Sequence, residues 1–340
     1  MTRIAIHGAG SIGCFVGGVW AAAGLDVTLV GRDYVQETIS KHGMTLTDYD
    51  GFSAQVPAGD VAFSTSPSAL AEADIIGLAV KSTGTERAAE EIKAHANPGA
   101  VVVSLQNGIS NVEKLRSLLP EQTVLAGMVP FNVVAMEGGR WHKGTLGVLM
   151  ADRHSALQPI VDAASGGPAT LELRDDMLSV AWGKLLLNLN NAINALAGIP
   201  LYDELSDRNY RRVLAACIKE GLTVLEAADI EPAKVSAFPP KWLPAFVGSP
   251  NFLFNTIGLK LQKVDRHARS SMADDFDMGR KSEIDYLNGE VVALAKKLGI
   301  EAPVNQAIVD LVKQVDAGEK KTWSGEALRA KTLTTKTKGA

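Results

Sequence analysis

The residues Gly8-Ala9-Gly10-Ser11-Ile12-Gly13 form a G-x-G-x-x-G run near the start of the chain. Between a strand and a helix, the first glycine of such a run permits the tight turn, the second lets the backbone approach a pyrophosphate, and the third allows close helix–strand packing. The helix N-terminus then offers N–H groups and a partial positive charge to the phosphates. The run therefore predicts a dinucleotide site made by Gly8, Gly10, Ser11, Ile12 and Gly13. The alternative is a glycine-rich turn that holds no ligand.

The next apolar run ends at Val30-Gly31-Arg32, where NAD-specific folds usually carry an acid for the ribose 2′-hydroxyl. A guanidinium at this place can pair with a 2′-phosphate through its planar fork. Arg32 therefore favours NADP(H) over NAD(H) as the cofactor. Asp33 follows directly, and its acidic side chain favours NAD(H) instead. The alternative for Arg32 is a solvated surface residue with no role in cofactor binding.

Polar residues also follow two later apolar runs: Lys81 comes after 75–80, and Asn107 comes shortly after 101–105. Ligands of doubly wound sheets bind beyond the C-terminal ends of the strands. We therefore expect Lys81 to meet a phosphate or a carboxylate, and Asn107 to contact the nicotinamide or the substrate. The alternatives are a surface charge for Lys81 and the first position of an Asn-Gly turn for Asn107.

The apolar stretch 182–194 carries one lysine and four asparagines. On a helix, Lys184, Asn188 and Asn191 fall within about 60° of one another and form one stripe. Asn190 and Asn194 form a second stripe. The surrounding leucines imply burial, and buried amide and ammonium groups need partners. A polar substrate would supply some of these partners, and a polar network between helices is the alternative.

Ser282 and Asp285 have the spacing of a helix-capping box. This spacing predicts that Glu283 lies in the first turn of a helix, where the helix dipole favours an ionised carboxylate. We expect Glu283 to be a charged partner for Lys184 and for hydroxyl groups of the substrate. The alternative is a surface acid that only stabilises the helix.

Short apolar runs alternate with helical stretches in the first half of the chain, and helical patterns dominate the second half. The alternation predicts an α/β fold, with an N-terminal doubly wound Rossmann-type parallel sheet and a C-terminal all-helical domain. The expected strands are 3–7, 26–30, 75–80 and 101–105, with edge strands in 124–134 and 144–150. The expected helices are 12–24, 85–96, 177–197, 207–228, 282–298 and 304–315. The expected parts are a nucleotide-binding domain over 1–175, a helical substrate domain over 176–317 and a loosely ordered basic tail over 318–340.

The composition excludes several classes of protein. With 34 Lys and Arg against 38 Asp and Glu, the net charge of −4 provides no basic field for nucleic acid or an anionic membrane. Cys14 and Cys217 are isolated, so we expect no disulfide framework and no metal site, and a reducing cytoplasm as the location. The uncharged stretch 4–25 resembles a signal peptide or a membrane span, but its six glycines make a poor lipid-spanning helix.

From residue 4 to about residue 312, the chain resembles the ketopantoate reductase (2-dehydropantoate 2-reductase) family. The resemblance rests on the glycine turn, Leu105-Gln106-Asn107-Gly108, the Lys184-x-x-x-Asn188 helix, and Ser270-Ser271-Met272 followed by Glu283-Ile284-Asp285-Tyr286-Leu287-Asn288-Gly289. It implies an NADPH-binding Rossmann domain, a helical domain and a cleft between them. It also implies reduction of a 2-keto acid to a 2-hydroxy acid, of which 2-dehydropantoate to D-pantoate in pantothenate synthesis is the namesake reaction.

The resemblance also implies roles for single residues. Lys184 matches the family's general acid, and Glu283 matches the acid that binds substrate and organises the site. Asn188 and Ser271 match substrate-binding positions, while Asn107 and Lys81 match the junction of cofactor and substrate. The family helix often has a second Asn eight residues after the lysine; here Ala192 stands there, and the neighbouring Asn191 is expected to replace it.

Three other functions stay open at this point. A relative within the family would reduce a different 2-keto acid, since 232–265 is longer than the family's minimal form and the tail after residue 318 is an addition. A non-catalytic NADP(H)-binding sensor would not need the acid groups in the cleft. A 3-hydroxyacid dehydrogenase would carry Lys-x-x-Asn, whereas this helix carries Lys-x-x-x-Asn. The sequence leaves the oligomeric state open, with a homodimer as one arrangement.

Overall fold

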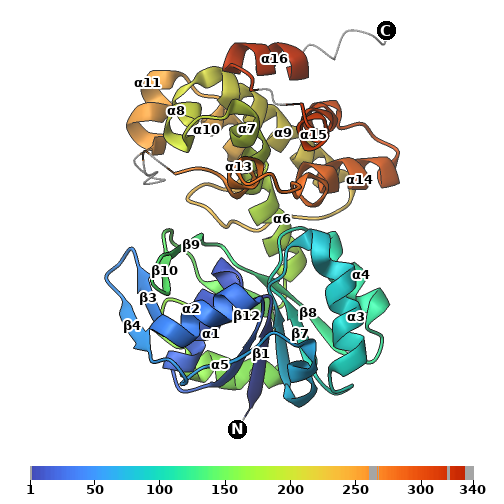
Figure 1. Ribbon diagram of the computed structural model, residues 1–340. Helices are drawn as coiled ribbons and strands as arrows, with labels where there is room; N and C mark the ends of the chain where they lie inside the picture. The colour runs from blue at the N-terminus through green and yellow to red at the C-terminus, as the bar shows by residue number, and fades with distance from the viewer. Residues whose placement is uncertain (1, 260–265, 267, 320–321, 334–340) are drawn as a thin grey trace. The chain divides into compact units, whose positions relative to one another are not determined.

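The computed structural model describes residues 2–259, 266, 268–319 and 322–333. The chain divides into two compact units, Met1–Met177 and Leu178–Ala340. The expected boundary at residue 175 lies close to this division. Figure 1 shows a sheet with flanking helices in the first unit and helices in the second.

The first unit is built on an eight-stranded sheet with the order β12-β11-β8-β7-β6-β1-β2-β5. Neighbouring strands pair in parallel, except that β11 runs antiparallel to β8. The strands are β1 (Arg3–His7), β2 (Asp26–Val30), β5 (Ala62–Ser64), β6 (Ile75–Leu78), β7 (Val101–Ser104), β8 (Thr123–Met128), β11 (Leu149–Asp152) and β12 (Leu171–Arg174). This sheet confirms the expected α/β class.

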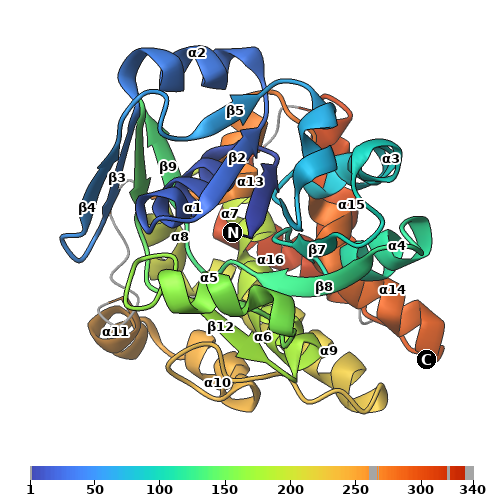
Figure 2. The same ribbon diagram turned by 90° about the horizontal axis from the view of Figure 1, so that it is seen from below.

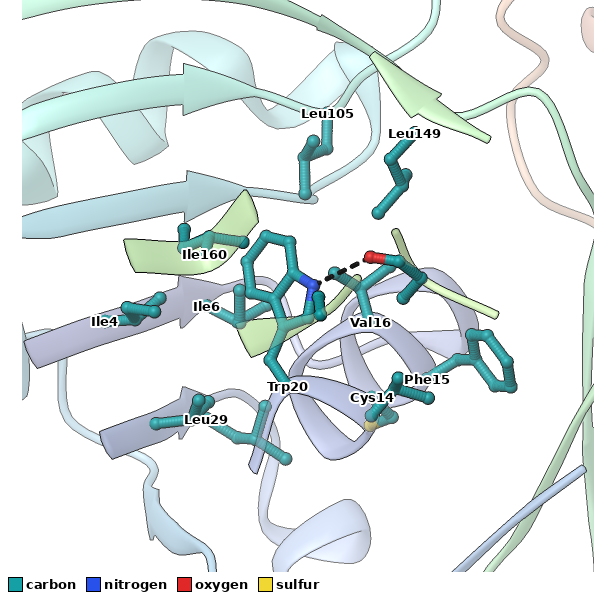
Figure 3. Close-up of a cluster of buried hydrophobic side chains, with 14 of the residues drawn as sticks. Ile4, Ile6, Cys14, Phe15, Val16, Trp20, Leu29, Leu105, Leu149 and Ile160 are labelled. Atoms are coloured by element: carbon teal, nitrogen blue, oxygen red, sulfur yellow. Dashed lines mark hydrogen bonds between the residues drawn. The ribbon is translucent and has the colours of Figure 1, made fainter. Parts of the chain in front are cut away.

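Helices cover both faces of this sheet, because side chains alternate along each strand. Ile4 and Ile6 of β1 belong to the apolar core that includes α1, and Ala5 belongs to the core that includes α3 and α4. Figure 2 shows α1 on one side of the sheet and α3 and α4 on the other. Trp20 of α1 lies inside the first core and donates a 3.0 Å hydrogen bond from its Nε1 to the carbonyl oxygen of Ala169 (Figure 3). The helices of this unit are α1 (Ser11–Ala22), α2 (Asp33–His42), α3 (Thr85–His95), α4 (Ser110–Leu118) and α5 (Gln158–Ala163), with short 3-10 turns η1 (Pro67–Glu72), η2 (Ser82–Gly84) and η3 (Ser155–Leu157).

A second, four-stranded sheet with the order β4-β3-β10-β9 was not expected from the sequence. Its strands are β3 (Met44–Asp48), β4 (Ser53–Val56), β9 (Val133–Met136) and β10 (Arg140–Lys143). β10 pairs in parallel with β3, and the paired residues, such as Arg140 and Thr45, are 95 positions apart in the chain. The expected edge strand 124–134 is therefore split: β8 joins the main sheet and β9 joins the second sheet.

The second unit is helical, and its described residues contain no strand, as the fold class predicted. The 20-residue helix α9 contacts α10, α14, α15 and α16. The helices are α6 (Met177–Asn188), α7 (Asn190–Ala197), α8 (Leu201–Ser206), α9 (Arg208–Ala227), α10 (Leu243–Val247), α11 (Asn251–Leu253), α13 (Ser271–Asp277), α14 (Asn288–Leu298), α15 (Pro303–Asp316) and α16 (Gly325–Leu333), with the turns η4 (Pro240–Trp242), η5 (Phe254–Gly258) and η6 (Ile284–Tyr286).

Within the expected tail, the described residues 322–333 differ from the expectation of a loosely ordered segment. Residues 325–333 form α16, and Leu328 is buried within the unit. The hydroxyl of Tyr210 on α9 donates a 2.7 Å hydrogen bond to the carbonyl oxygen of Trp323. Apolar contacts and this hydrogen bond therefore hold 322–333 against α9, whereas the last part of the expected tail, 334–340, lies outside the described residues.

Candidate active site

The glycine turn connects β1 to α1. Gly8 has a φ of +110°, which favours glycine, and a Cβ atom there would lie 2.6 Å from the backbone nitrogen of Val80. A Cβ on Gly13 would lie 2.2 Å from the carbonyl oxygen of Gly8, so Gly13 lets α1 sit directly on the turn. A Cβ on Gly10 would meet no protein atom within 4 Å. Packing within the chain therefore requires glycine at positions 8 and 13, and at position 10 it leaves open space beside the start of α1.

That open space fits the phosphates of a dinucleotide. Gly10 is the N-cap of α1, and the first turn of the helix has no acidic residue. The first N–H groups of a helix have no partner within it and attract an anion together with the helix dipole. The residues present thus suit the expected pyrophosphate.

Arg32 follows β2 and is the N-cap of α2, with an exposed side chain. Among the residues that the structure describes, it makes no salt bridge. Asp33 lies in the first turn of α2, where the helix dipole favours a carboxylate. This position gives Asp33 a structural role and removes the need to read it as a ligand of the ribose.

Lys81 follows β6, which neighbours β1, and Asn107 follows β7, which neighbours β6. His7 pairs with Leu78 of β6, and Leu78 pairs with Ser104 of β7, so the residues after these three strands lie at one edge of the sheet. The side chain of Lys81 is exposed, and that of Asn107 is half-buried. The structure therefore brings the glycine turn, Lys81 and Asn107 to the same edge, as the sequence predicted.

Lys184 lies on α6 in the second unit. A Cβ on the preceding Gly183 would lie 2.3 Å from the carbonyl oxygen of Ala233, whose N–H donates to the carbonyl oxygen of Ser179. The start of the stretch 232–265 thus packs on the helix beside Lys184. Burial lowers the pKa of Lys184 to about 8, and the negative charge of Glu283 opposes this shift. The two side chains are therefore electrostatic partners, and Lys184 still carries its proton near neutral pH.

The two asparagine stripes have different surroundings. Asn188 and Asn191 are half-buried, like Lys184. Asn190 and Asn194 are buried and bonded within the unit: the Nδ2 of Asn190 donates to Glu204, and the Nδ2 of Asn194 donates to the carbonyl oxygen of Ile199. The expected helix 177–197 is also interrupted by a turn at Leu189. The second stripe is thus a polar network between helices, and only the first leaves polar groups near a surface.

Ser271 is the first residue of α13 and is exposed. Ser270 before it is buried and is the N-cap: its Oγ accepts a hydrogen bond from the N–H of Ala273 and donates to the carbonyl oxygen of Asn191. The N–H of Ser270 donates a 2.9 Å hydrogen bond to the Oδ1 of Asn194. These bonds fix the start of α13, and with it Ser271, against α7.

The expected capping box at Ser282 is wrong. The hydroxyl of Ser282 donates to the Oδ2 of Asp316 at 2.6 Å, and Asp285 pairs with Lys313 at 2.8 Å. Both residues therefore bind α15, and α14 begins only at Asn288. Glu283 precedes the short turn η6 and is half-buried, so its carboxylate does not lie in the first turn of a long helix.

Both units contain further buried polar side chains that the sequence did not single out. Thr85 and Asn111 are 1% exposed and lie under the loops that carry Lys81 and Asn107. Glu204 and Arg211 are 0% exposed in the second unit. None of these residues stands in a sequence motif. Their burial is what distinguishes them, and burial is known only from the tertiary structure.

Residues 2–259, 266, 268–319 and 322–333 contain no group of three or more His, Cys, Asp or Glu side chains that could hold a metal ion. Over the same residues, we find no helix with the length and apolar character needed to cross a membrane.

Two family descriptions match the chain. The family described as Ketopantoate reductase PanE/ApbA matches residues 4–152, and Ketopantoate reductase PanE/ApbA C terminal matches residues 176–316. Together they account for most of both units.

Individual relatives cover nearly the whole chain. A 2-dehydropantoate 2-reductase from Halobacterium salinarum is 29% identical over 318 residues, which are 92% of this chain and 98% of that protein. The crystal structure of a PanE/ApbA family ketopantoate reductase from Ralstonia eutropha is 30% identical, with a TM-score of 0.78, over 93% of this chain and 99% of that one. A ternary structure of D-mandelate dehydrogenase with NADH and anilino(oxo)acetate shares the fold, with a TM-score of 0.75 at 19% identity, over 93% of this chain and 99% of that one.

Proposed function

Since the chain belongs to the ketopantoate reductase family, we propose that it reduces 2-dehydropantoate to D-pantoate with NADPH, as a step in pantothenate synthesis. The family makes the protein an oxidoreductase that acts on a 2-keto acid with a nicotinamide nucleotide. The choice of NADPH and of 2-dehydropantoate belongs to the proposal. The observation that carries the proposed reduction is the pairing of buried Lys184 with the negative charge of Glu283.

Lys184 is the proposed general acid. When bound, the reduced nicotinamide supplies a hydride to the keto carbon, and negative charge grows on the keto oxygen. The ammonium of Lys184 stabilises this charge and donates its proton, so that a hydroxyl group results. Glu283 keeps Lys184 protonated despite its burial, because a nearby negative charge favours the charged form of lysine.

Polar side chains of the second unit orient the keto acid. Asn188 ends α6, the helix that carries Lys184, and Asn191 lies in the first turn of α7. Ser271 begins α13, which Ser270 ties to α7. Amide and hydroxyl groups can bind the carboxylate and the hydroxyl of 2-dehydropantoate at once, because they donate and accept hydrogen bonds. We assign these three residues to substrate binding.

The edge of the main sheet is the proposed NADPH site. The backbone of Gly10, Ser11 and Ile12 would bind the pyrophosphate at the start of α1, with Gly8 and Gly13 shaping the turn. Arg32 would bind the 2′-phosphate, and its exposed guanidinium supports this role. Lys81 and Asn107 would contact the cofactor near the nicotinamide, and Asn107 would also reach the keto acid.

The test is NADPH oxidation by the purified protein with 2-dehydropantoate, repeated with NADH and with a panel of other 2-keto acids. We expect the highest kcat/KM for NADPH with 2-dehydropantoate. Lys184→Ala should lower kcat by at least about 10²–10⁴-fold while NADPH still binds. Growth of a pantothenate-requiring strain that lacks its own reductase would check the pathway. Near-normal turnover by a folded Lys184→Ala protein would refute the general-acid role.

Reduction of a different 2-keto acid is the second candidate function. Its support is the contact of Ala233 with Gly183, which brings the long stretch 232–265 next to the lysine helix. The panel decides between the two, since the preferred keto acid would show the higher kcat/KM. Tight NADPH binding without oxidation of any keto acid would favour a sensor.

Two further expectations belong to this proposal. A homodimer stays a prediction, which light scattering on the purified protein would check. A reducing, cytoplasmic location also stays a prediction, supported by Cys14 and Cys217, both of which are unpaired and buried.

A further inference from the structure

A cluster of buried polar side chains lies under the loops that follow β6 and β7. Its members come from two segments, residues 82–85 and 104–111. They are Ser82, Thr85, Ser104, Gln106 and Asn111, each between 1% and 6% exposed. Buried polar groups cost free energy unless they are hydrogen-bonded, so the bonds within this cluster define one arrangement of the two loops.

The hydroxyl of Thr85 lies at the centre of the cluster. Its Oγ1 is 2.8 Å from each of three atoms: the carbonyl oxygen of Ser82, the Oδ1 of Asn111 and the Nε2 of Gln106. The Nε2 of Gln106 donates to Oγ1, and the single hydroxyl hydrogen serves the two oxygen acceptors. One hydroxyl therefore links the segment after β6 to the segment after β7.

Two further bonds carry this link to Asn107. The carbonyl oxygen of Asn107 accepts a 2.5 Å hydrogen bond from the Nδ2 of Asn111 and a 3.1 Å hydrogen bond from the Oγ of Ser82. The amide of Gln106 also reaches the carbonyl oxygen of Lys81, at 3.5 Å. Asn111 thus binds Thr85 with one side of its amide and Asn107 with the other.

Glycines make both loops dependent on such bonds. Gly84 comes directly before Thr85, and Gly108, with a φ of +89°, comes directly after Asn107. Glycine leaves the backbone a wide choice of conformations. Hydrogen bonds from the cluster to the carbonyl oxygens of Asn107 and Lys81 restrict this freedom.

We propose that Thr85 is a positioning residue of the reductase: through Asn111 and Gln106, its hydroxyl sets the backbone of Asn107 and thereby aims the Asn107 side chain at the nicotinamide and the keto acid. The proposal rests on the function proposed above, because it takes over the role of Asn107 from there. Thr85 is buried and acts only through its neighbours. Since Thr85, Gln106, Asn111 and Ser82 are uncharged, the cluster acts on geometry and leaves the pH dependence of kcat unchanged.

The first test compares Thr85→Val, which keeps the shape and removes the hydroxyl, with Thr85→Ser, which keeps the hydroxyl. We expect Thr85→Val to lower kcat by about 10–100-fold, the range that a small misplacement near the reacting atoms causes, and Thr85→Ser to restore it. Binding of 2′-phospho-ADP-ribose should stay unchanged, because this fragment lacks the nicotinamide. Thr332→Val is the matched control: Thr332 is also 1% exposed, and its Oγ1 donates to the carbonyl oxygen of Leu328 on α16. It should keep the wild-type kcat.

The second test asks whether Thr85 acts through Asn107. If it does, the double variant Thr85→Val/Asn107→Ala loses no more kcat than Asn107→Ala alone. If the double variant instead loses kcat by the product of the two single losses, Thr85 acts independently of Asn107 and the proposal is overturned. Wild-type kcat in Thr85→Val, together with a large loss in Asn107→Ala, would also overturn it and would leave the proposed function intact.

Two further experiments apply if Thr85→Val does not fold or if the wild-type protein reduces no keto acid. If Thr85→Val does not fold, Asn111→Ala breaks the same link one bond closer to Asn107 and should give the same loss of kcat. If the wild-type protein reduces no keto acid, hydrogen–deuterium exchange decides whether the hydroxyl holds the loop. Exchange over 107–111 should then be faster in Thr85→Val and normal in Thr85→Ser, and equal exchange in all three proteins would refute the link.

Discussion

The Nδ2 of Asn190 donates a 3.0 Å hydrogen bond to the Oε2 of Glu204, and both side chains are buried among the helices of the second unit. Burial raises the pKa of Glu204 to about 8, against the opposing influence of the Asn190 and Asn194 amides and of the Arg211 charge; Asp207 raises it further. The folded protein therefore holds a proton at Glu204 at a pH where the unfolded chain has released it.

This relationship predicts a pH-dependent stability. The contribution of Glu204 is complete below its unfolded pKa and is lost as the pH rises toward about 8, because the unfolded chain binds fewer protons there. For one group the slope is at most about 1.4 kcal/mol per pH unit. Glu204→Gln keeps an acceptor for Asn190 and cannot ionise. Urea unfolding of both proteins across roughly pH 5 to 8 should show the variant gaining relative stability as the pH rises. Parallel curves would contradict a raised pKa.

The pKa of Lys184 predicts the pH dependence of the reaction. A general acid works only while protonated, so kcat should fall as the pH rises through about 8. Glu283→Gln removes the charge that supports the protonated form, so the fall should move to lower pH. The measurement is kcat at saturating NADPH and keto acid across roughly pH 6 to 10. A flat profile in the wild-type protein, or no displacement in Glu283→Gln, would exclude this pairing from the proton transfer.

Arg32 predicts the choice between the two nicotinamide cofactors. Loss of a charged hydrogen bond of about 1.5–3 kcal/mol corresponds to roughly a 10–100-fold loss of affinity. Arg32→Ala should therefore raise the KM for NADPH by that factor and leave the KM for NADH nearly unchanged. Arg32→Lys should recover part of the NADPH preference, since it keeps the charge and loses the planar fork. A strong preference of the wild-type protein for NADH would overturn the assignment.

The glycine turn predicts different outcomes for two alanine substitutions. Gly13→Ala places a Cβ atom 2.2 Å from the carbonyl oxygen of Gly8, so it should lower the free energy of unfolding by a few kcal/mol or more. Gly10→Ala meets no protein atom within 4 Å, so the fold should be kept. Its methyl group should instead occupy the space of the pyrophosphate and weaken NADPH binding. Thermal unfolding without cofactor and titration with NADPH separate the two effects. Normal NADPH affinity in Gly10→Ala would remove this turn from the cofactor site.

Local patterns in the sequence were sufficient for the first elements of the first unit, but not for its second sheet. β1 and β2 occupy the expected residues, and the helix after the glycine turn begins within a residue of its expected start. The physical reason is that alternating apolar runs, glycines with fixed spacing and helical periodicity act over a few neighbouring residues. Residues at the ends of adjacent parallel strands share one edge, so the common location of the glycine turn, Lys81 and Asn107 also followed from the sequence.

The tertiary structure alone decided which polar side chains face each other. The sequence showed two asparagine stripes of the same composition, but Asn194 binds Ser270, 76 residues later, while Asn188 stays half-buried. Ser282 had the spacing of a capping residue, yet Asp316 offers it a stronger, charged acceptor from another helix. Thr85 gave no local signal at all, because its partner Asn111 follows the next strand. Hydrogen bonds between segments distant in the chain depend on how the helices and strands pack, and local spacing does not encode that packing.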